Sequence, residues 1–223
     1  MSALICGSMA FDTIMVFQDQ FKNHILPEQV HILNVSFLVP EMRRNFGGCA
    51  GNIAFNLRML EGDGLPMGTV GSDFGPYAAW MDEQSIPRSA LREIPRAFTA
   101  QAYITTDMDD NQITAFHPGA MNQAHEVRVD EIAGVTLGMV SPDGRQGMID
   151  HAAQFAEAGI PFALQSGFEV YVPKTRVVLL EAAVAAGHGR LLPCGYRGTT
   201  SFSISSGARP LAHPDGECAR EVG

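Results

Sequence analysis

The chain has 223 residues, of which 46% are apolar, enough to bury a sizeable core in one domain with a small appendage. Its formal charge of −9 and its pI near 5.1 argue against a nucleic-acid or anionic-membrane partner. The four cysteines form no Cys-x-x-Cys pair, and no secretory leader or long apolar run is visible. We therefore expect a soluble protein of the reducing cytoplasm.

In the first half of the chain, apolar runs broken by turn residues predict several strands. The predicted strands cover residues 3–6, 13–17, 30–39 and 67–71. A helix follows the glycines at 47, 48 and 51, because Ile53, Leu57 and Leu60 recur at helical spacing before Gly62 stops them. A second, short helix is expected at residues 77–84.

In the second half, residues 100–106 and 112–117 predict a hairpin closed by the polar turn 107–111. A buried strand is expected at 135–140, then a helix at 147–158 and a strand at 160–164. Strands that alternate with helices indicate a parallel sheet of the α/β class. The strand at 30–39 and the hairpin do not fit that alternation, so we expect a small β appendage beside the sheet.

Beyond residue 164 the pattern changes. Residues 175–186 predict one helix that ends at Gly187, and from Pro193 onward Gly, Pro, Ser and Arg mix without periodicity. We therefore divide the chain into residues 1–164 and a divergent tail, 165–223, that is partly helical and then irregular.

The most informative stretch is 45–54, in which Gly47, Gly48, Gly51 and Asn52 open a helix. Adjacent glycines let backbone N–H groups approach a ligand, and the first helical turn offers unpaired donors with a partial positive charge. The pattern predicts a small-molecule site at a helix N-terminus, and the alternative is a tight turn with an N-cap.

Other motifs are absent or incomplete. Asp107, Asp109 and Asn111 imitate the start of a calcium loop, but Gln112 and Pro118 stand where its glycine and glutamate belong, which favours a polar hairpin turn. The histidines lack metal-ligand spacing, so no metal site is predicted. There is no phosphate-binding Gly-x-x-x-x-Gly-Lys loop and no Gly-x-Ser-x-Gly elbow, and the glycine spacing does not fit a dinucleotide-binding dehydrogenase.

Four segments together resemble the ribokinase family, and within it the bacterial adenosine kinases. They are residues 6–12 (CGSMAFD), 47–54 (GGCAGNIA), 68–75 (GTVGSDFG) and 104–107 (ITTD) with 116–120 (FHPGA). The match runs in order from Met1 to about Phe162. It implies a ribokinase-like, three-layer α/β core, a small β lid built from about residues 13–46 and 98–118, and a homodimer formed through the lid.

The resemblance also implies substrate-binding residues. Asp12 would accept hydrogen bonds from two ribose hydroxyls, and Phe116 would stack on a purine. Their alternatives are a turn-forming aspartate and a core residue of the hairpin. The remaining positions that the resemblance assigns to the same pocket are Ser8, Ser36, Gly47, Gly48 and Asn52.

The activity implied is ATP- and Mg²⁺-dependent phosphoryl transfer to the primary hydroxyl of adenosine or a related sugar or nucleoside. After Phe162, however, the Asp-Pro step and the Gly-x-Gly-Asp motif, with its anion hole and general base, are not visible. We therefore predict no catalytic residue in this chain and doubt its ATP site. The alternatives are a non-catalytic nucleoside-binding or dimerising protein, and a truncated or frameshifted fragment without activity.

Overall fold

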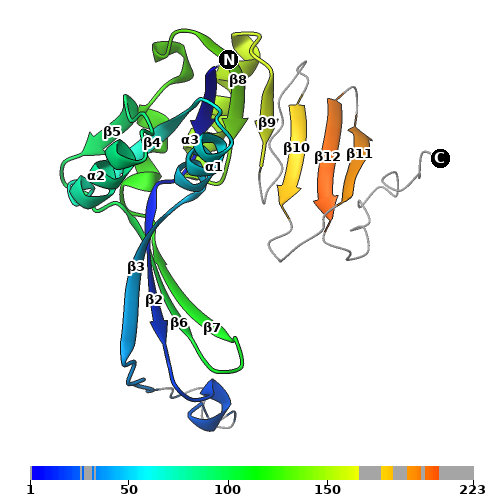
Figure 1. Cartoon of the computed structure of the whole chain (residues 1–223). Helices are drawn as coiled ribbons and strands as arrows, with labels where there is room; N and C mark the ends of the chain where they lie inside the picture. Colours follow the sequence, from blue (N-terminus) through cyan, green and yellow to red (C-terminus); the bar gives the residue numbers. More distant parts are fainter. Residues whose placement is uncertain are drawn as a thin grey trace.

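The computed structural model describes residues 2–25, 27, 32 and 34–165, and the backbone of three strands at 177–182, 190–196 and 199–205. These residues form two sheets. A core sheet carries helices on both faces, and a second, narrow sheet projects from one end of it as a lid (Figure 1). The ribokinase-like α/β fold with a small β lid is therefore confirmed.

The core sheet is parallel around a central strand, β1 (Ser2–Cys6). β4 (Gly64–Gly71) and β5 (Ala90–Ile94) lie on one side of β1, and β8 (Val135–Val140) and β9 (Phe162–Leu164) lie on the other, in the order β9-β8-β1-β4-β5. Cys6 pairs with Met67 on one side and with Val140 on the other. Beyond β9 the sheet continues through β10 (Val177–Ala182), β12 (Thr199–Ser205) and β11 (Arg190–Tyr196).

Alternate residues of β1 enter two separate hydrophobic cores. Leu4 and Cys6 pack with α3 (Arg145–Glu157), and Ile5 packs with α1 (Cys49–Met59) and α2 (Gly75–Glu83). The 3-10 helices η3 (Gly119–Glu126) and η4 (Val129–Glu131) lie beside α3. Because α1 and α2 cover one face and α3 the other, the connections change sides between β1 and β8. No helix among the described residues has the length and apolar character needed to span a bilayer.

The lid is a four-stranded sheet in the order β3-β2-β6-β7. It contains β2 (Ala10–Val16), β3 (Glu41–Gly47), β6 (Ala100–Thr106) and β7 (Gln112–His117). β2 pairs with β6 in parallel, and the other two pairs are antiparallel. β7 is exposed along its whole length, so the lid has little core of its own.

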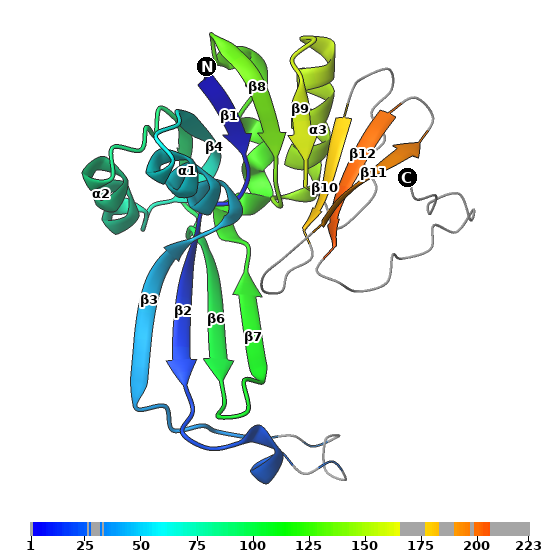
Figure 2. The same cartoon turned by 45° about the vertical axis from the view of Figure 1, so that its right-hand side comes forward.

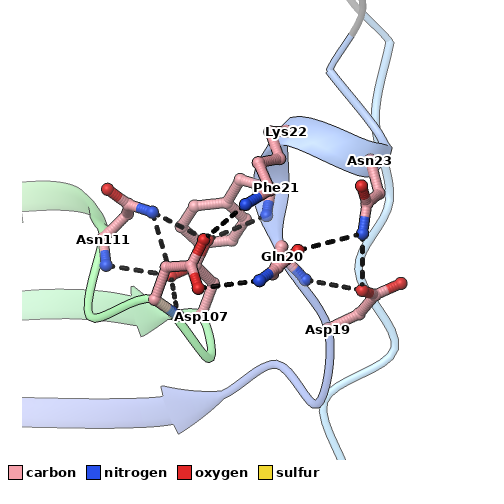
Figure 3. Close-up of polar contacts among 8 residues, drawn as sticks. Asp19, Gln20, Phe21, Lys22, Asn23, Asp107 and Asn111 are labelled. Carbon is pink, nitrogen blue, oxygen red and sulfur yellow. Dashed lines mark hydrogen bonds and ion pairs between the residues drawn. The ribbon is translucent and has the colours of Figure 1, made fainter.

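A polar cluster closes the far end of the lid, where the turn after β6 meets the 3-10 helix η1 (Phe21–Asn23) (Figure 3). The buried Asp107 carboxylate accepts the Phe21 N–H at 2.8 Å and the N–H groups of Asp109 and Asn111 at 2.9 Å each. Burial raises the pKa of Asp107, but these donors outweigh it and lower the pKa to about 2. The turn at 107–111 is thus the predicted polar hairpin turn, with Asp107 as its centre.

The predicted hairpin strands and the strand at 135–140 have the predicted bounds. The strand predicted at 30–39 is wrong for residues 34–39, which form no regular structure, and the lid strand begins at Glu41 instead. The helix predicted at 175–186 is wrong for Val177–Ala182, which form β10, since a short apolar run suits a buried parallel strand equally well. β5 was not predicted.

We expect Asp107→Ala to lower the free energy of unfolding by about 1–3 kcal/mol, because buried N–H groups lose their acceptor. Chemical denaturation measures the loss, and hydrogen exchange should quicken at Phe21 and Asn111. Asp130→Ala is the control: Asp130 is exposed, it pairs with Arg128 at 2.6 Å, and its loss should leave the free energy of unfolding nearly unchanged. Equal costs for the two variants would contradict this role of Asp107.

Candidate functional site

The junction between lid and core brings two chain crossings together. The chain leaves β1 at Cys6 and enters the lid as β2, and it returns along β3 to Gly47 and enters α1 through Gly48 (Figure 2). Ala10 pairs with Gly47, so the two crossings are neighbours. They lie beside the carboxyl end of β1, where the connections change sides, and ligands of open α/β sheets bind at such a point.

Both glycines of the junction are required by close packing. A Cβ on Gly47 would overlap the Asp12 carboxylate, with its Cγ only 2.7 Å away. Gly48 has φ +86°, and a Cβ there would lie 2.5 Å from the Ser8 carbonyl oxygen. The paired glycine therefore lets the Asp12 side chain lie directly against the backbone that enters α1.

Asp12 and Phe116 lie in one row across the lid. The registers place Asn45, Asp12, Ala102 and Phe116 side by side, so their side chains share one face of the sheet. Two strand spacings, or about 10 Å, separate Asp12 from Phe116. Burial raises the pKa of Asp12, whereas the Phe116 ring is 51% exposed. This face thus presents a hydrogen-bond acceptor and an open aromatic surface to one ligand.

Ser8 uses its oxygen atoms to hold the start of α1. Its Oγ accepts the Cys49 N–H at 3.0 Å, and its carbonyl oxygen accepts the Ala50 N–H at 3.0 Å. The expectation of unpaired donors in the first turn is therefore wrong for these two groups, because a residue 41 positions earlier satisfies them. A ligand role for Ser8 stays a prediction that would use its hydroxyl proton.

The other two predicted residues, Asn52 and Ser36, are not members of the Asp12 row. Asn52 is exposed on the first turns of α1, and its carbonyl oxygen accepts the Asn56 side chain at 2.8 Å. Ser36 precedes Phe37, whose ring packs on Phe17 and Phe21 at the far end of the lid. Ser36 therefore lies about one lid length from Asp12 in the same chain.

Sequence reasoning missed two residues of the junction. The buried Tyr77 hydroxyl donates to the Gly47 carbonyl at 2.9 Å, and burial together with the Asp12 charge raises the pKa of Tyr77. The Asp143 Oδ2 atom is buried and has no hydrogen-bond partner among the described residues, while its Oδ1 accepts the Gly144 N–H at 2.9 Å. Burial raises the pKa of Asp143 to about 7. No local signal marks either residue, since the Tyr77 partner lies 30 positions away and the burial of Asp143 depends on the folded chain.

Comparison with known proteins gives this junction a family. Residues 10–141, from the first lid strand to the end of β8, match the pfkB family carbohydrate kinases. The chain belongs to this family. The predicted resemblance to ribokinase-like kinases is thereby confirmed, and the match contains Asp12, both glycines and Phe116.

Related pfkB-family proteins include nucleoside kinases. The nucleoside kinase of Methanocaldococcus jannaschii is 33% identical over 96 residues, which are 42% of this chain and 32% of that protein. A Burkholderia thailandensis nucleoside kinase, solved in complex with inosine, is 49% identical with a TM-score of 0.65, over 74% of this chain and 52% of that one. The crystal structure of the M. jannaschii enzyme has a TM-score of 0.66 at 22% identity and shows the fold alone. The matches cover 32% of the M. jannaschii protein by sequence and 60% by structure, and 52% of the B. thailandensis enzyme, so the chain spans less than two thirds of either kinase.

We expect Asp143→Asn to stabilise this pfkB-family chain at pH 8. The folded pKa of Asp143, about 7, lies above its ordinary value of 3.8, so the stability it contributes is full below pH 4 and is lost as the pH rises through 7. The neutral amide avoids this loss, which is on the order of a few kcal/mol. The difference in free energy of unfolding between the variant and the wild type should therefore narrow toward pH 5. Urea unfolding at both pH values measures it. A variant less stable at pH 8 would mean that the carboxylate has a partner.

Proposed function

We propose that residues 2–165 form the nucleoside-binding half of a pfkB-family kinase, and that its ligand is a purine nucleoside. The observation that carries this proposal is the shared lid face of Asp12 and Phe116. A purine nucleoside is bound by a hydrogen-bond acceptor at its ribose hydroxyls and by a flat apolar surface at its base. These two groups must be separated by about the length of the nucleoside. The row Asp12–Ala102–Phe116 offers both, with the small Ala102 between them.

In this proposal the Asp12 carboxylate accepts hydrogen bonds from two neighbouring ribose hydroxyls. Burial makes the ionised carboxylate less favourable in the empty site, so donors from a ligand are correspondingly favoured. The carboxylate packs against Gly47 on one side, and in this proposal the sugar approaches it from the other side. The exposed Phe116 ring gains apolar burial when a base covers it.

The same contacts favour a purine base but do not select one purine over another. A stacked ring distinguishes purines poorly from one another, because each presents a similar flat surface. The B. thailandensis enzyme was solved with inosine, and we extend that ligand class to this chain, with adenosine as the other member. We propose that the chain binds both nucleosides and that it takes part in purine salvage in the cytoplasm.

Phosphoryl transfer from Mg²⁺–ATP is the family reaction, and for this chain it is a further proposal. The residues described here do not fit a triphosphate at the junction: the Cys49 and Ala50 N–H groups are already bonded to Ser8. The described residues also hold no cluster of three acidic, histidine or cysteine side chains suited to a metal ion. We therefore assign the phosphoryl donor no residue and propose that nucleoside binding does not depend on it.

We expect isothermal titration of the 223-residue chain with inosine or adenosine to show binding that Asp12→Asn weakens by about 10- to 100-fold, since a charge-assisted hydrogen bond is lost. Phe116→Ala should weaken it about tenfold and leave stability nearly unchanged, because the ring is exposed. Met108→Ala, an equally exposed apolar residue at the lid turn, is the matched control and should bind normally.

Release of ADP from ATP, Mg²⁺ and nucleoside then separates the two classes of function. Binding without ADP would favour the non-catalytic nucleoside-binding alternative. Turnover that Asp12→Asn abolishes would show a working kinase. Wild-type protein that folds and binds neither nucleoside would overturn the proposed function.

We also propose that the lid joins two copies of the chain. Among the described residues, both outer strands, β3 and β7, have free edges, and the face opposite the Asp12 row carries the row Met42, Met15, Thr105 and Ile113, which is apolar except for Thr105. Met42 and Ile113 are exposed at its two ends. Such a row is covered when two lids pack face to face.

Light scattering should give about twice the 24.0 kDa of one chain, and Met42→Lys with Ile113→Lys should restore the single mass. Substituting Leu60 by Lys, on the exposed end of α1, adds the same kind of charge away from the lid and should leave the dimer intact. A monomeric wild-type chain would overturn this proposal.

A further inference from the structure

Asp73 belongs to the core, yet its carboxylate is bonded to the lid. It lies in the loop between β4 and α2, within the segment 68–75 that contributed to the family resemblance. Its Oδ1 accepts the Thr99 N–H at 2.7 Å, and its Oδ2 accepts the Gln101 side-chain amide at 3.0 Å. The Arg44 guanidinium lies 3.9 Å from the same Oδ2. Nothing in the proposed ligand contacts explains this arrangement.

The two hydrogen-bond donors and the ion-pair partner come from lid strands on either side of β2. Thr99 and Gln101 lie at the start of β6, and Arg44 lies on β3. One core carboxylate therefore holds both strands that flank the Asp12 strand. Its side chain is 23% exposed, and charge-assisted hydrogen bonds at such a half-buried position are stronger than neutral ones.

Backbone contacts beside Asp73 join the same two parts. The Gly71 N–H donates to Thr99 Oγ1 at 3.0 Å, and the Ser72 N–H donates to the Ala97 carbonyl at 3.0 Å. A Cβ on Gly71 would overlap the backbone of Phe98 and Thr99. The loop 71–73 and the entry to β6 are thus in direct contact, with the Asp73 charge at the lid side.

The Asp73 contacts lie one residue from the candidate site. Gln101 pairs with Phe11 and His117, and the next row contains Asp12, Ala102 and Phe116. Arg44 pairs with Thr13, and its guanidinium carbon lies 3.8 Å above the Phe11 ring. Gln101 and Arg44 share the lid face opposite Asp12, so Asp73 holds the lid from behind while the ligand face stays open.

We propose that Asp73 is a positioning residue: it fixes the lid on the core, and so sets where Asp12 and Phe116 stand for the nucleoside. This inference rests on the proposed function for its consequence in binding, but not for its consequence in lid order. Loss of the Asp73 charge frees β3 and the start of β6 from the core. The ligand must then order the lid as it binds, and its affinity falls.

The test compares Asp73→Asn with Asp82→Asn. Asp82 lies on α2, is exposed, and pairs with Arg88 at 2.8 Å within the core, so its substitution removes the same charge without touching the lid. We expect Asp73→Asn to raise the Kd for inosine about tenfold and Asp82→Asn to leave it unchanged. Hydrogen exchange without nucleoside should quicken at Gly71 and Ser72 in Asp73→Asn alone.

Reversal of the amide–carboxylate pair distinguishes positioning from general stability. In Asp73→Asn with Gln101→Glu, the new amide donates to the new carboxylate, and we expect the Kd and the exchange rates to return most of the way to wild type. If Asp73→Asn does not fold, Gln101→Ala can replace it, because this variant removes one hydrogen-bond donor from the lid alone. It should raise the Kd and the exchange rates at Gly71 and Ser72 in the same direction by a smaller amount. Unchanged exchange at Gly71 and Ser72 would overturn the proposal. Faster exchange in a chain that binds no nucleoside would support it while the proposed function fails.

Discussion

The candidate site depends on the packing of the Asp12 carboxylate against Gly47, where a Cβ would overlap that carboxylate. A half-buried carboxylate with a raised pKa is costly in the empty chain, and it is tolerated because its surroundings are fixed. Tyr77 fixes the Gly47 carbonyl, and Ser8 fixes the first turn of α1. The Asp12 carboxylate thus belongs to the lid, but its position is fixed by residues of the core.

The attachment of the lid to the core also explains why so small a sheet keeps its shape. β7 is exposed throughout, and four strands with open faces bury too little apolar surface to be stable alone. Contacts at both ends hold the lid in place. At the far end the Phe17, Phe21 and Phe37 rings pack together beside the hydrogen bonds of Asp107, and at the near end the lid is bonded to the Asp73 loop. Asp143 differs from these residues, because one oxygen of its buried carboxyl has no hydrogen-bond partner among the described residues. Its ionisation at high pH therefore lowers the free energy of unfolding.

The sequence predicted the features that are local. The hairpin at 100–117 follows from alternation and a polar turn, and Gly47 and Gly48 were recognised because close approach demands them. Residues 30–39 alternate in sequence as a strand would, but the described residues 34–39 form no strand, and it is Glu41–Gly47 that pairs with β2. Leu60, predicted on the apolar face of α1, is 80% exposed because the core side of that helix is Ala50, Gly51 and Ala54. Tyr77 and Asp73 act through partners 26 to 30 residues away along the chain, and Asp143 is buried by the fold, neither of which periodicity can reveal.

These contacts also show which part of a kinase can be separated from the rest. Asp12, Gly47, Tyr77, Asp73 and Phe116 all lie before residue 117, and each of their partners is within the same stretch. No described contact of the Asp12 row depends on the strands beyond β9. Under the proposed function, the nucleoside contacts are therefore confined to residues 10–117, and they require only that the core hold the lid at the Asp73 loop.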